Sequence, residues 1–361
     1  MRRTLIGRQS FTGRGALSNP PGRFDKQELE SVDDGWYQDE VPDSIPTTLE
    51  PDRAREVIST NDSPDIPFEQ SINPYRGCET ACVYCFARPS HAYMGLSPGL
   101  DFETRLFYKA DAAKVLEGQL ARPGYVCNSI TLGANTDPYQ PVERRMKVTR
   151  SILEVLARTR HPVSIISKHA LVLRDLDLLT DLASDGLVSV AISVTTLDSE
   201  LKRVMEPRAA SPQARLRTLA TLSAAGIPTS VMAAPMIPAL NDHELETILE
   251  AAAAAGAHWA GYVLLRLPYE IKDLFREWLT AHYPDRADHV MSLVRDMRGG
   301  QDYDSRFGVR MRGTGPYAQL LSNRFRLACR RLNLNREPRK PLRSDMFQPP
   351  GPRGAQLQLG L

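Results

Sequence analysis

The stretch Asn73-Pro-Tyr-Arg-Gly-Cys78-Glu-Thr-Ala-Cys82-Val-Tyr-Cys85-Phe86 carries three cysteines within eight residues, spaced C-x3-C-x2-C. Three thiolates on one tight loop can hold three irons of a cubane iron–sulfur cluster, whereas ordinary electron-transfer clusters use four cysteines. With three protein ligands, one iron stays open for an outside ligand. The spacing therefore predicts a 4Fe-4S cluster on Cys78, Cys82 and Cys85 with one exchangeable position.

Other uses of these cysteines stay open. A zinc site would need a fourth Cys or His, and His91, six residues after Cys85, is a candidate. Buried structural cysteines are a second alternative. A disulfide framework is a poor explanation, because the chain has five cysteines, an odd number, in 361 residues. The density of cysteines indicates a metal or cluster in a reducing compartment, and we expect a cytoplasmic protein.

Outward from the cysteines, short β-branched runs alternate with helical patterns. The runs are nearly continuous in apolar residues, as expected for parallel strands covered on both faces. We expect strands at 70–73, 129–132, 163–167, 188–194, 229–233 and 262–265, with helical patterns at 148–156, 171–182 and 216–222. About six β/α units with right-handed crossovers predict an α/β fold, a partial (β/α)6 TIM-like barrel whose site lies at the C-terminal ends of the strands.

The helix ends are marked by their own residues. Gly186, Gly226 and Gly256 each follow a helical run and precede a strand, as helix C-cap glycines do. Asn241 with Glu244 three residues later is typical of a capping box at a helix start.

The composition divides the chain into four parts. Residues 1–65 show little hydrophobic periodicity and are expected to be an irregular or disordered N-terminal extension. Residues 66–283 hold the β/α core, 284–335 a helical C-terminal extension, and 336–361 a Pro-rich tail. No run of about 18 apolar residues exists, so no membrane span is expected. The basic start lacks the apolar core of a secretory signal, and a net charge of +2 says little about partners.

With Tyr84 directly before the last cysteine, the motif resembles that of the radical S-adenosylmethionine superfamily. The segments 87–93 and 136–141, the latter reading Thr-Asp-Pro-Tyr-Gln-Pro, resemble the branch of the spore photoproduct lyases and their uncharacterised relatives. The resemblance covers residues 67–265. It implies that S-adenosyl-L-methionine takes the open iron and is cleaved reductively. A 5′-deoxyadenosyl radical then abstracts hydrogen from an unidentified substrate, and an electron donor such as flavodoxin or ferredoxin supplies the electron.

The resemblance also implies contacts for this cofactor at consecutive strand ends. Gly133, Asn135 and Asp137 follow the second strand, where the superfamily binds the methionine amino group. Lys168 follows the third strand, where related lyases place a lysine near the cofactor carboxylate, which a cation suits. Ser193 ends the fourth strand and matches a serine near the ribose.

The adenine side is matched less sharply. Tyr84 corresponds to the aromatic residue whose backbone lies near adenine, and 235–238 resembles the apolar stretch that packs against that ring. A plain structural role is the alternative for each of these residues. A tight strand-to-helix turn also needs Gly and Asp at 133–137, and methionine at such a place is often core.

One departure from the branch concerns its hydrogen-donating cysteine, which the lyases keep just before the Thr-Ser-Asp-Pro-like loop. The corresponding position here is Ala134. Cys127 precedes the strand and is expected at its opposite end, and Cys329 lies in a basic helical stretch. The missing cysteine counts against repair of DNA photoproducts, and no catalytic residue beyond the cluster ligands is assigned.

The substrate side is poorly marked. The candidates for the mouth of the barrel are the segment Glu206-Pro-Arg208, Arg266 and the segment 313–317, with surface or intramolecular ion pairs as the alternative for the arginines. Eight basic residues between 321 and 345 indicate either a nucleic-acid face or a salt-bridged helix exterior. Nucleic-acid lesion repair or base modification, and a non-catalytic iron–sulfur or zinc protein, therefore remain as alternative functions.

Overall fold

The computed structural model describes residues 11–25 and 44–351 of the chain. Its main feature is a seven-stranded sheet in the order β10-β9-β8-β7-β6-β3-β2. Six neighbouring strands run parallel, and β2 pairs antiparallel with β3 at one edge. The strands are β2 (Ile58–Thr60), β3 (Gln70–Ile72), β6 (Ile130–Leu132), β7 (Val163–Ser167), β8 (Val188–Ser193), β9 (Thr229–Met236) and β10 (Trp259–Leu264).

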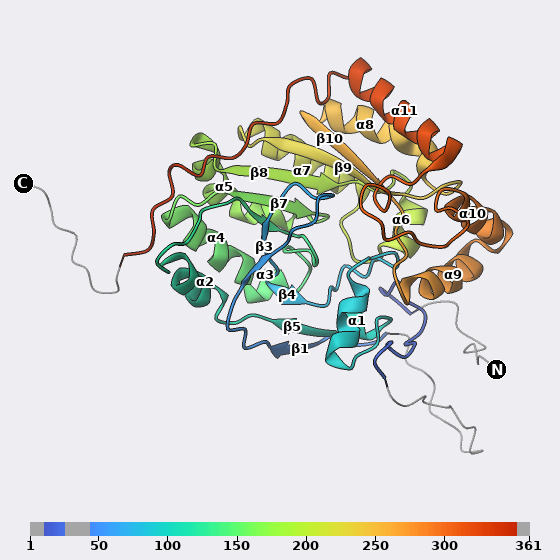
Figure 1. Ribbon diagram of the computed structural model, residues 1–361, viewed down its shortest axis with the longest axis horizontal. Coiled ribbons are helices and arrows are strands. Elements are labelled where there is room, and N and C mark those ends of the chain that lie inside the picture. Colours follow the sequence, from blue (N-terminus) through green and yellow to red (C-terminus); the bar gives the residue numbers. More distant parts are fainter. Residues whose placement is uncertain (1–10, 26–43, 352–361) are drawn as a thin grey trace, which may run out of the picture.

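This mixed α/β fold with a parallel sheet confirms the fold class expected from the alternating pattern. Each of the six runs that the sequence marks as a strand overlaps one of the parallel strands, although β9 extends beyond its run and β10 begins three residues before it. The central strand β8 is buried along all six residues, which explains its continuous apolar run. In Figure 1 the carboxyl ends of β8 and β9 point toward helix α6 (Ser199–Met205). Loops that follow the strands therefore meet at that end of the molecule.

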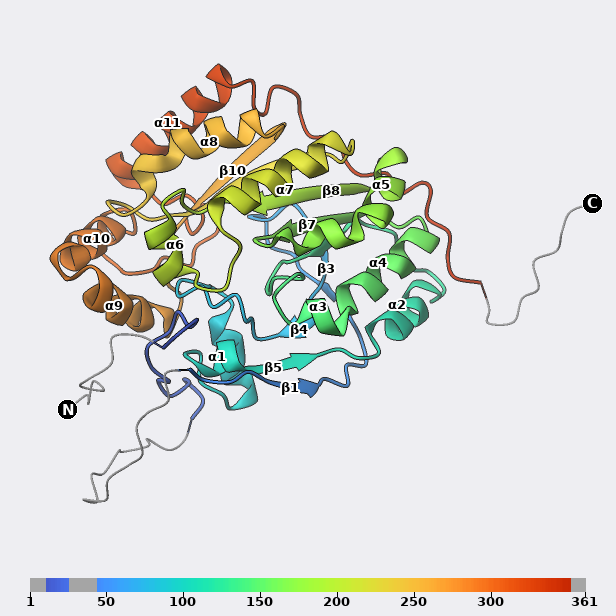
Figure 2. The same ribbon diagram turned by 180° about the vertical axis from the view of Figure 1, so that it is seen from behind.

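Helices pack on the outer face of this sheet and form the largest apolar core with it. Figure 2 shows α5 and α7 in front of β7 and β8. Leucine, isoleucine and valine side chains from the strands and from these helices make up most of this core. The helices on the connections are α2 (Ala112–Leu120), α3 (Glu143–Met146), α4 (Val148–Arg158), α5 (Leu176–Ser184), α7 (Pro212–Ala224) and α8 (Leu245–Ala254), with short 3-10 turns η2 (Ala170–Asp175) and η3 (Asp242–Glu244).

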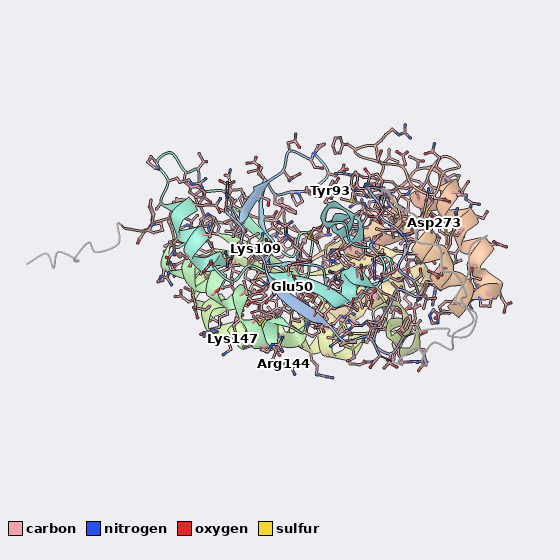
Figure 3. All side chains as sticks on the ribbon, turned by 90° about the horizontal axis from the view of Figure 1, so that it is seen from below. Glu50, Tyr93, Lys109, Arg144, Lys147 and Asp273 are labelled. Atoms are coloured by element: carbon pink, nitrogen blue, oxygen red, sulfur yellow. The ribbon has the colours of Figure 1, made fainter. Side chains whose placement is uncertain are left out.

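A second, three-stranded sheet is absent from the sequence prediction. It has the order β1-β5-β4, with β1 (Thr48–Pro51), β5 (Arg105–Tyr108) and β4 (Tyr75–Arg76). Figure 3 looks at this side of the molecule, with Glu50 labelled on β1. The expectation of an irregular segment at 1–65 is thus wrong for β1 and β2, while its parts at 1–10 and 26–43 lie outside the described residues. Both strands are too short and too polar to show a period.

The helix ends agree with the sequence at the glycines and differ at Asn241. Gly186, Gly226 and Gly256 have φ of +71°, +76° and +86°, the left-handed conformation that glycine adopts without strain. Asn241 makes no capping hydrogen bond. Its side chain instead accepts from the Ile237 N–H and donates to the carbonyl of Thr195, at 2.7 Å each. The capping-box prediction is therefore wrong, because a tertiary partner takes the asparagine side chain.

The C-terminal part is helical, as its composition suggested, but it does not form a separate core. Helix α11 (Gly315–Arg331) packs on α8 and places Leu321 and Ala328 in the main apolar core. Helices α9 (Ile271–His282) and α10 (Pro284–Asp296) form a second cluster with α6 and with the cysteine-bearing loop. They stand beside α6 in Figure 1. The helices therefore cover the end of the sheet at which the site was expected.

Residues 336–351 run back along the opposite end of the sheet (Figure 1). The N–H of Arg343 donates to the carbonyl of Gly186, and that of Gln348 donates to the carbonyl of Thr159. Phe347 contacts the rings of Tyr125 and His161, with centroids 5.5 and 5.3 Å apart. This Pro-rich segment thus covers the amino ends of strands β7 and β8. No helix within the described ranges is long and apolar enough to cross a membrane.

Candidate metal centre

The cysteine loop, residues 77–86, connects β4 to the 3-10 turn η1 (Arg88–Met94) close after the first parallel strand. Cys78 and Cys82 are buried and Cys85 is partly exposed, and none of the three is in a disulfide. Cys85 packs against the apolar cluster that contains Cys78 and against the one that contains Cys82. Burial raises the pKa of the Cys78 thiol to about 12 and also raises the pKa values of Cys82 and Cys85.

These thiols fit an iron–sulfur cluster better than a single metal ion. Buried thiols with raised pKa values become thiolates readily only when a cation compensates their charge, as iron does. Among the described residues, no three His, Cys, Asp or Glu side chains are arranged around one ion. His91, the candidate fourth zinc ligand, is fully buried, and its Nε2 is 3.0 Å from the carbonyl of Arg105. A donor set of three sulfurs on one loop is what a cubane with one open iron requires.

A buried arginine, Arg88, binds the backbone of the cysteine loop. Arg88 donates two hydrogen bonds to the carbonyl of Cys82, at 2.9 and 2.8 Å, and is ion-paired with the buried Glu103. The same carboxylate accepts from the Ala16 N–H at 2.9 Å, through the oxygen that is paired with Arg88, and from the Gly15 N–H at 3.0 Å through its other oxygen. Helix α1 (Asp101–Thr104), which carries Glu103, thus links the N-terminal segment 11–18 to the loop. Nothing in the sequence pattern indicated this set of contacts.

The loop that follows β6, residues 133–141, supports the cysteine loop from the side. Gln140 accepts from the Glu79 N–H at 2.7 Å and donates to the carbonyl of Gly77 at 3.3 Å. Gly133 has a φ of +93°, and a Cβ there would lie 2.1 Å from the Ile166 carbonyl oxygen, so that only glycine fits. The Thr-Asp-Pro-Tyr-Gln-Pro sequence is therefore explained in part as a structural support for the cysteines.

Asp137 and Asn135 lie at the site in the expected loop, but the aspartate already has protein partners. The Asp137 carboxylate accepts from the Ser167 hydroxyl and the Lys168 N–H at 2.8 Å each and from the Tyr139 N–H at 2.9 Å. The backbone N–H of Asn135 donates to the Asn73 side chain at 3.0 Å. Asp137 thus joins the ends of β6 and β7. Its side chain has the structural role in the turn after β6 that the sequence offered as the alternative to cofactor binding.

Lys168 and Ser193 meet at the ends of neighbouring strands. The Lys168 Nζ lies 2.6 Å from the Ser193 Oγ and 3.3 Å from a carboxylate oxygen of Glu206. Glu206 is fully buried and ion-paired with Arg215, which is also buried. Burial opposes ionisation of Glu206, but Arg215 and Lys168 outweigh it and hold the pKa of Glu206 below its usual range. The result is a charged, nearly dry group of side chains beside the cysteine loop.

Tyr84 connects this charged group to the cysteines. Its hydroxyl donates to Glu206 and lies 3.3 Å from the Thr195 Oγ1, and the Lys168 Nζ lies 5.7 Å from the centre of its ring. Burial raises the pKa of Tyr84 well above its ordinary value, so the hydroxyl remains a donor. The sequence comparison predicted a role for the backbone of Tyr84 near adenine. It did not predict the hydrogen bond between the Tyr84 hydroxyl and Glu206.

The two candidate arginines of the mouth differ. Arg208 is ion-paired with Glu79 at 3.0 Å, which agrees with the ion pair considered as the alternative to a substrate contact. Arg266, just after β10, forms no ion pair among the described residues, and its guanidinium carbon lies 4.8 Å from the ring centre of Phe86. Phe86, which follows Cys85 in the chain, is 43% exposed, so its ring can be reached from outside the protein. Arg266 is therefore better placed than Arg208 to contact a substrate.

Other sequence candidates lie elsewhere. In the segment 313–317, the Tyr317 hydroxyl donates to Asp242 at 2.6 Å, which holds α11 on the helical layer. Cys127 precedes β6, at the end away from the cysteine loop, and Cys329 is buried in α11. Three arginines of the basic stretch 321–345 are paired with carboxylates: Arg324 with Glu246, Arg331 with Glu250 and Arg343 with Asp345. The salt-bridged helix exterior is thus the better description of that stretch.

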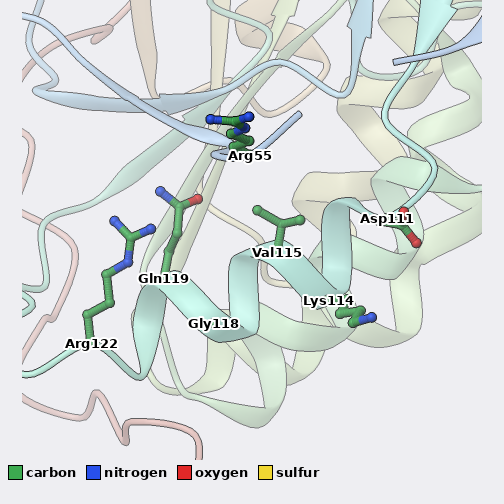
Figure 4. Close-up of a pocket in the computed structure, with 7 residues that line it drawn as sticks. All are labelled: Arg55, Asp111, Lys114, Val115, Gly118, Gln119 and Arg122. Atoms are coloured by element: carbon green, nitrogen blue, oxygen red, sulfur yellow. The ribbon is translucent and has the colours of Figure 1, made fainter. Parts of the chain in front are cut away.

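A hollow of about 370 Å³ lies on the outer surface over α2 (Figure 4). Its walls include Arg55, Lys114 and Arg122 together with the apolar Val115. None of its residues belongs to the cysteine loop or to the charged group around Glu206. We assign no part of the metal centre to it.

Comparison with known proteins gives one family and a group of structures. The model of the family described as "Radical SAM superfamily" matches residues 72–252. The uncharacterized protein Rv2578c of Mycobacterium tuberculosis is 40% identical over 232 residues, which are 64% of this chain and 68% of that protein. The uncharacterized protein MJ0683 of Methanocaldococcus jannaschii is 28% identical over 219 residues, 61% of this chain and 78% of that protein.

Similar solved structures include spore photoproduct lyases. The lyase complexed with dinucleoside spore photoproduct has a TM-score of 0.58 and 15% identity, with 79% of each chain covered. A mutant of the lyase with bound AdoMet and dinucleoside spore photoproduct has a TM-score of 0.54 and 16% identity, covering 79% of this chain and 78% of that chain. At such identities the likeness concerns the fold.

Proposed function

We propose a reaction for this chain from the premise that it belongs to the radical S-adenosylmethionine superfamily, whose model matches half of it. Members of this superfamily are enzymes, and the specific reaction of this one is unknown. We infer that residues 66–283 form its partial (β/α)6 barrel core, with 284–335 as a helical extension. We further infer that the chain binds a 4Fe-4S cluster through Cys78, Cys82 and Cys85, and S-adenosyl-L-methionine beside it.

The observation that carries this proposal is the position of three thiols, two buried and one partly exposed, next to the charged group of Lys168, Ser193 and Glu206. When bound, the cluster and S-adenosylmethionine supply a 5′-deoxyadenosyl radical that removes hydrogen from a substrate. A purely structural metal site would need no partly buried lysine beside a buried serine at neighbouring strand ends. The arrangement therefore favours an enzyme over a non-catalytic iron–sulfur or zinc protein.

The residues around the thiols are proposed to bind and orient the cofactor. Lys168 would donate to an anionic carboxylate, and Ser193 to a hydroxyl beside it. Gly133 and Asn135 would present backbone carbonyls to an ammonium group. Asp137 would act through Lys168, because its carboxylate holds the Lys168 N–H at 2.8 Å. Tyr84 would offer its backbone to the adenine edge.

Water must be kept away from a carbon radical, and the second apolar cluster is suited to this task. Helices α9 and α10 bring Phe275, Trp278 and Val290, all fully buried, into contact with the layer that includes Cys82 and Tyr84. We propose that this cluster closes one side of the site. The electron would come from a donor such as flavodoxin or ferredoxin, within the cytoplasm.

The substrate is unidentified, and nucleic-acid lesion repair or base modification is a second candidate. It is supported by the fold shared with a lyase complexed with dinucleoside spore photoproduct. Ala134 at the position of the lyases' cysteine and the paired arginines of 321–345 weigh against it. Binding of a single-stranded oligonucleotide that weakens steeply with salt would support the second candidate. Salt-insensitive or absent binding would remove it.

The main proposal is tested by anaerobic purification and reconstitution with iron and sulfide. We expect a brown protein with a 4Fe-4S electron paramagnetic resonance signal after reduction, and 5′-deoxyadenosine when S-adenosylmethionine and dithionite are added. Cys82→Ala should abolish both, whereas the matched control Cys329→Ala, in α11, should keep both. A colourless protein that holds one zinc ion would refute the proposal.

A further inference from the structure

A chain of three buried polar groups ends on one sulfur of the cysteine loop. The Thr80 Oγ1 lies 3.2 Å from the Cys78 Sγ, and the His169 Nε2 lies 2.9 Å from the same Thr80 oxygen. Cys78, Thr80 and His169 are 6%, 1% and 8% exposed. Water therefore has little access to compete for these hydrogen bonds, and their donors and acceptors are set by the protein.

The direction of the chain follows from the chemistry of a metal ligand. A cysteine that ligates iron is a thiolate, which can only accept a hydrogen bond. The Thr80 hydroxyl has one hydrogen, and once that hydrogen points to Cys78, its oxygen must accept from the His169 Nε2–H. Each bond strengthens the next, because accepting a hydrogen bond polarises the hydroxyl.

The position of His169 is fixed by the strand end that precedes it. The backbone N–H of His169 donates to the Ser167 hydroxyl oxygen at 3.0 Å, and the Ser167 hydroxyl donates to the Asp137 carboxylate at 2.8 Å. Burial lowers the pKa of His169, so the neutral ring with one N–H is the form that faces Thr80. The end of β7 thus reaches across the loop 133–141 to the cysteine loop.

The three cysteines are not equivalent in this respect. Within residues 11–25 and 44–351, Thr80 is the one side chain that hydrogen-bonds to a sulfur of Cys78, Cys82 or Cys85. Hydrogen bonds to cluster sulfurs are among the factors that set the reduction potential of an iron–sulfur cluster. Reduction adds negative charge to the sulfurs, and a donated hydrogen bond to a more negative acceptor is stronger.

We propose that the Thr80 hydroxyl, oriented by His169, donates to the Cys78 thiolate and raises the reduction potential of the cluster. His169 is then a positioning residue that acts through Thr80. This inference rests on the cluster proposed above and goes beyond it. It states that Thr80 and His169, which are not metal ligands, help to set the reduction potential of the cluster. In the measured step, one electron from dithionite enters each cluster, and no bond forms or breaks in the protein.

The test is a dithionite titration of the reconstituted protein, with the reduced cluster measured by electron paramagnetic resonance. Thr80→Val keeps the shape of the side chain and removes the hydroxyl. We expect it to lower the equilibrium constant for reduction about tenfold, which is about 59 mV for a one-electron couple. Thr80→Ser keeps the hydroxyl, so the reduction potential of its cluster should stay close to that of the wild type.

His169 gives an independent test that leaves the cysteine loop unchanged. His169→Leu should lower the reduction potential of the cluster, but by less than Thr80→Val does. His169→Gln keeps an N–H donor, so its potential should lie between those of His169→Leu and the wild type. Thr159→Val is the matched control, because Thr159 is buried but donates to helix carbonyls at the far end of β7. Its potential should equal that of the wild type.

The outcomes separate this inference from the function on which it rests. A wild-type protein without a reducible cluster would refute the proposed function itself. Intact clusters whose potentials do not change in Thr80→Val would overturn the inference alone. If Thr80→Val loses its cluster, the two His169 variants decide, and equal potentials for His169→Leu and the wild type would refute the role of the hydrogen-bond chain.

Discussion

Replacing Glu206 by glutamine tests the buried charge group that the structure places beside the cysteines. Glu206 accepts from the Thr195 hydroxyl at 2.7 Å and from the Tyr84 hydroxyl, and it is ion-paired with Arg215 and Lys168. Side chains of both Glu206 and Arg215 are at most 1% exposed. Glu206→Gln removes the only negative charge of this group and leaves Arg215 buried with no carboxylate partner among the described residues.

Breaking a buried ion pair by removing one partner destabilises a protein by about 3 to 5 kcal/mol. We expect Glu206→Gln to lower the free energy of unfolding by that amount, as measured by urea denaturation followed through tryptophan fluorescence. The Trp278 side chain reports on the region directly, because its Nε1 donates to the Val204 carbonyl at 3.0 Å. Affinity for S-adenosylmethionine should fall as well, because Lys168 and Tyr84 lose their common partner.

The helix that precedes Glu206 supplies a matched control. Glu200 is ion-paired with Arg203, but their side chains are 77% and 70% exposed. Glu200→Gln should leave the urea midpoint almost unchanged, since solvent and salt already screen an exposed pair. If Glu206→Gln and Glu200→Gln unfold at the same urea concentration, the charge group contributes nothing measurable, and the reasoning from burial is refuted.

Three further predictions concern parts of the fold away from the charge group. Phe347→Ala should lower the free energy of unfolding by about 2 kcal/mol in urea denaturation, since a half-buried phenylalanine is lost, and nuclear magnetic resonance should show the pKa of His161 rising from about 4. Burial lowers the pKa of both His91 and His161 from 6.5 to about 4. The unfolded chain therefore binds protons first, and urea midpoints should fall as pH drops from 6.5 to 4; equal midpoints at both ends would contradict this. Gly15→Ala places a Cβ 2.0 Å from a carbonyl oxygen of the cysteine loop and should expose the segment 11–18 to protease, whereas Gly118→Ala, which meets open space, should not.

The parallel strands were predictable because each carries its own signal. A strand such as β8 is apolar at nearly every position, and the glycine that ends the preceding helix marks where it begins. The cysteine loop is equally local, since its three thiols lie within eight residues. Features whose cause lies in the segment itself can be predicted from one sequence.

The partners of these features could not be predicted, because each of them depends on contacts between distant segments. Glu103 reads as an ordinary surface residue in a polar stretch, yet it is fully buried between Arg88 and the N–H groups of Gly15 and Ala16. Asn241 has the sequence of a helix cap and is used instead to join two strand ends. No periodicity marks such residues, and the burial of their charge becomes visible only in three dimensions.

The way in which the cysteine loop is held also indicates where selectivity for a substrate must come from. Gln140, Arg88 and Tyr84 each have their hydrogen bonds satisfied by the protein, so they fix the loop and have no polar group left for a substrate. Arg266 differs, because its Nε is buried without a hydrogen-bond partner among the described residues. Its Nη1 lies 3.6 Å from the Met311 sulfur, and its guanidinium lies over the exposed ring of Phe86. A cation beside an exposed aromatic ring suits an anionic or planar group. We therefore propose that the residues that hold the cysteine loop serve radical generation, and that Arg266, which has no ion pair among the described residues, contributes to the choice of substrate.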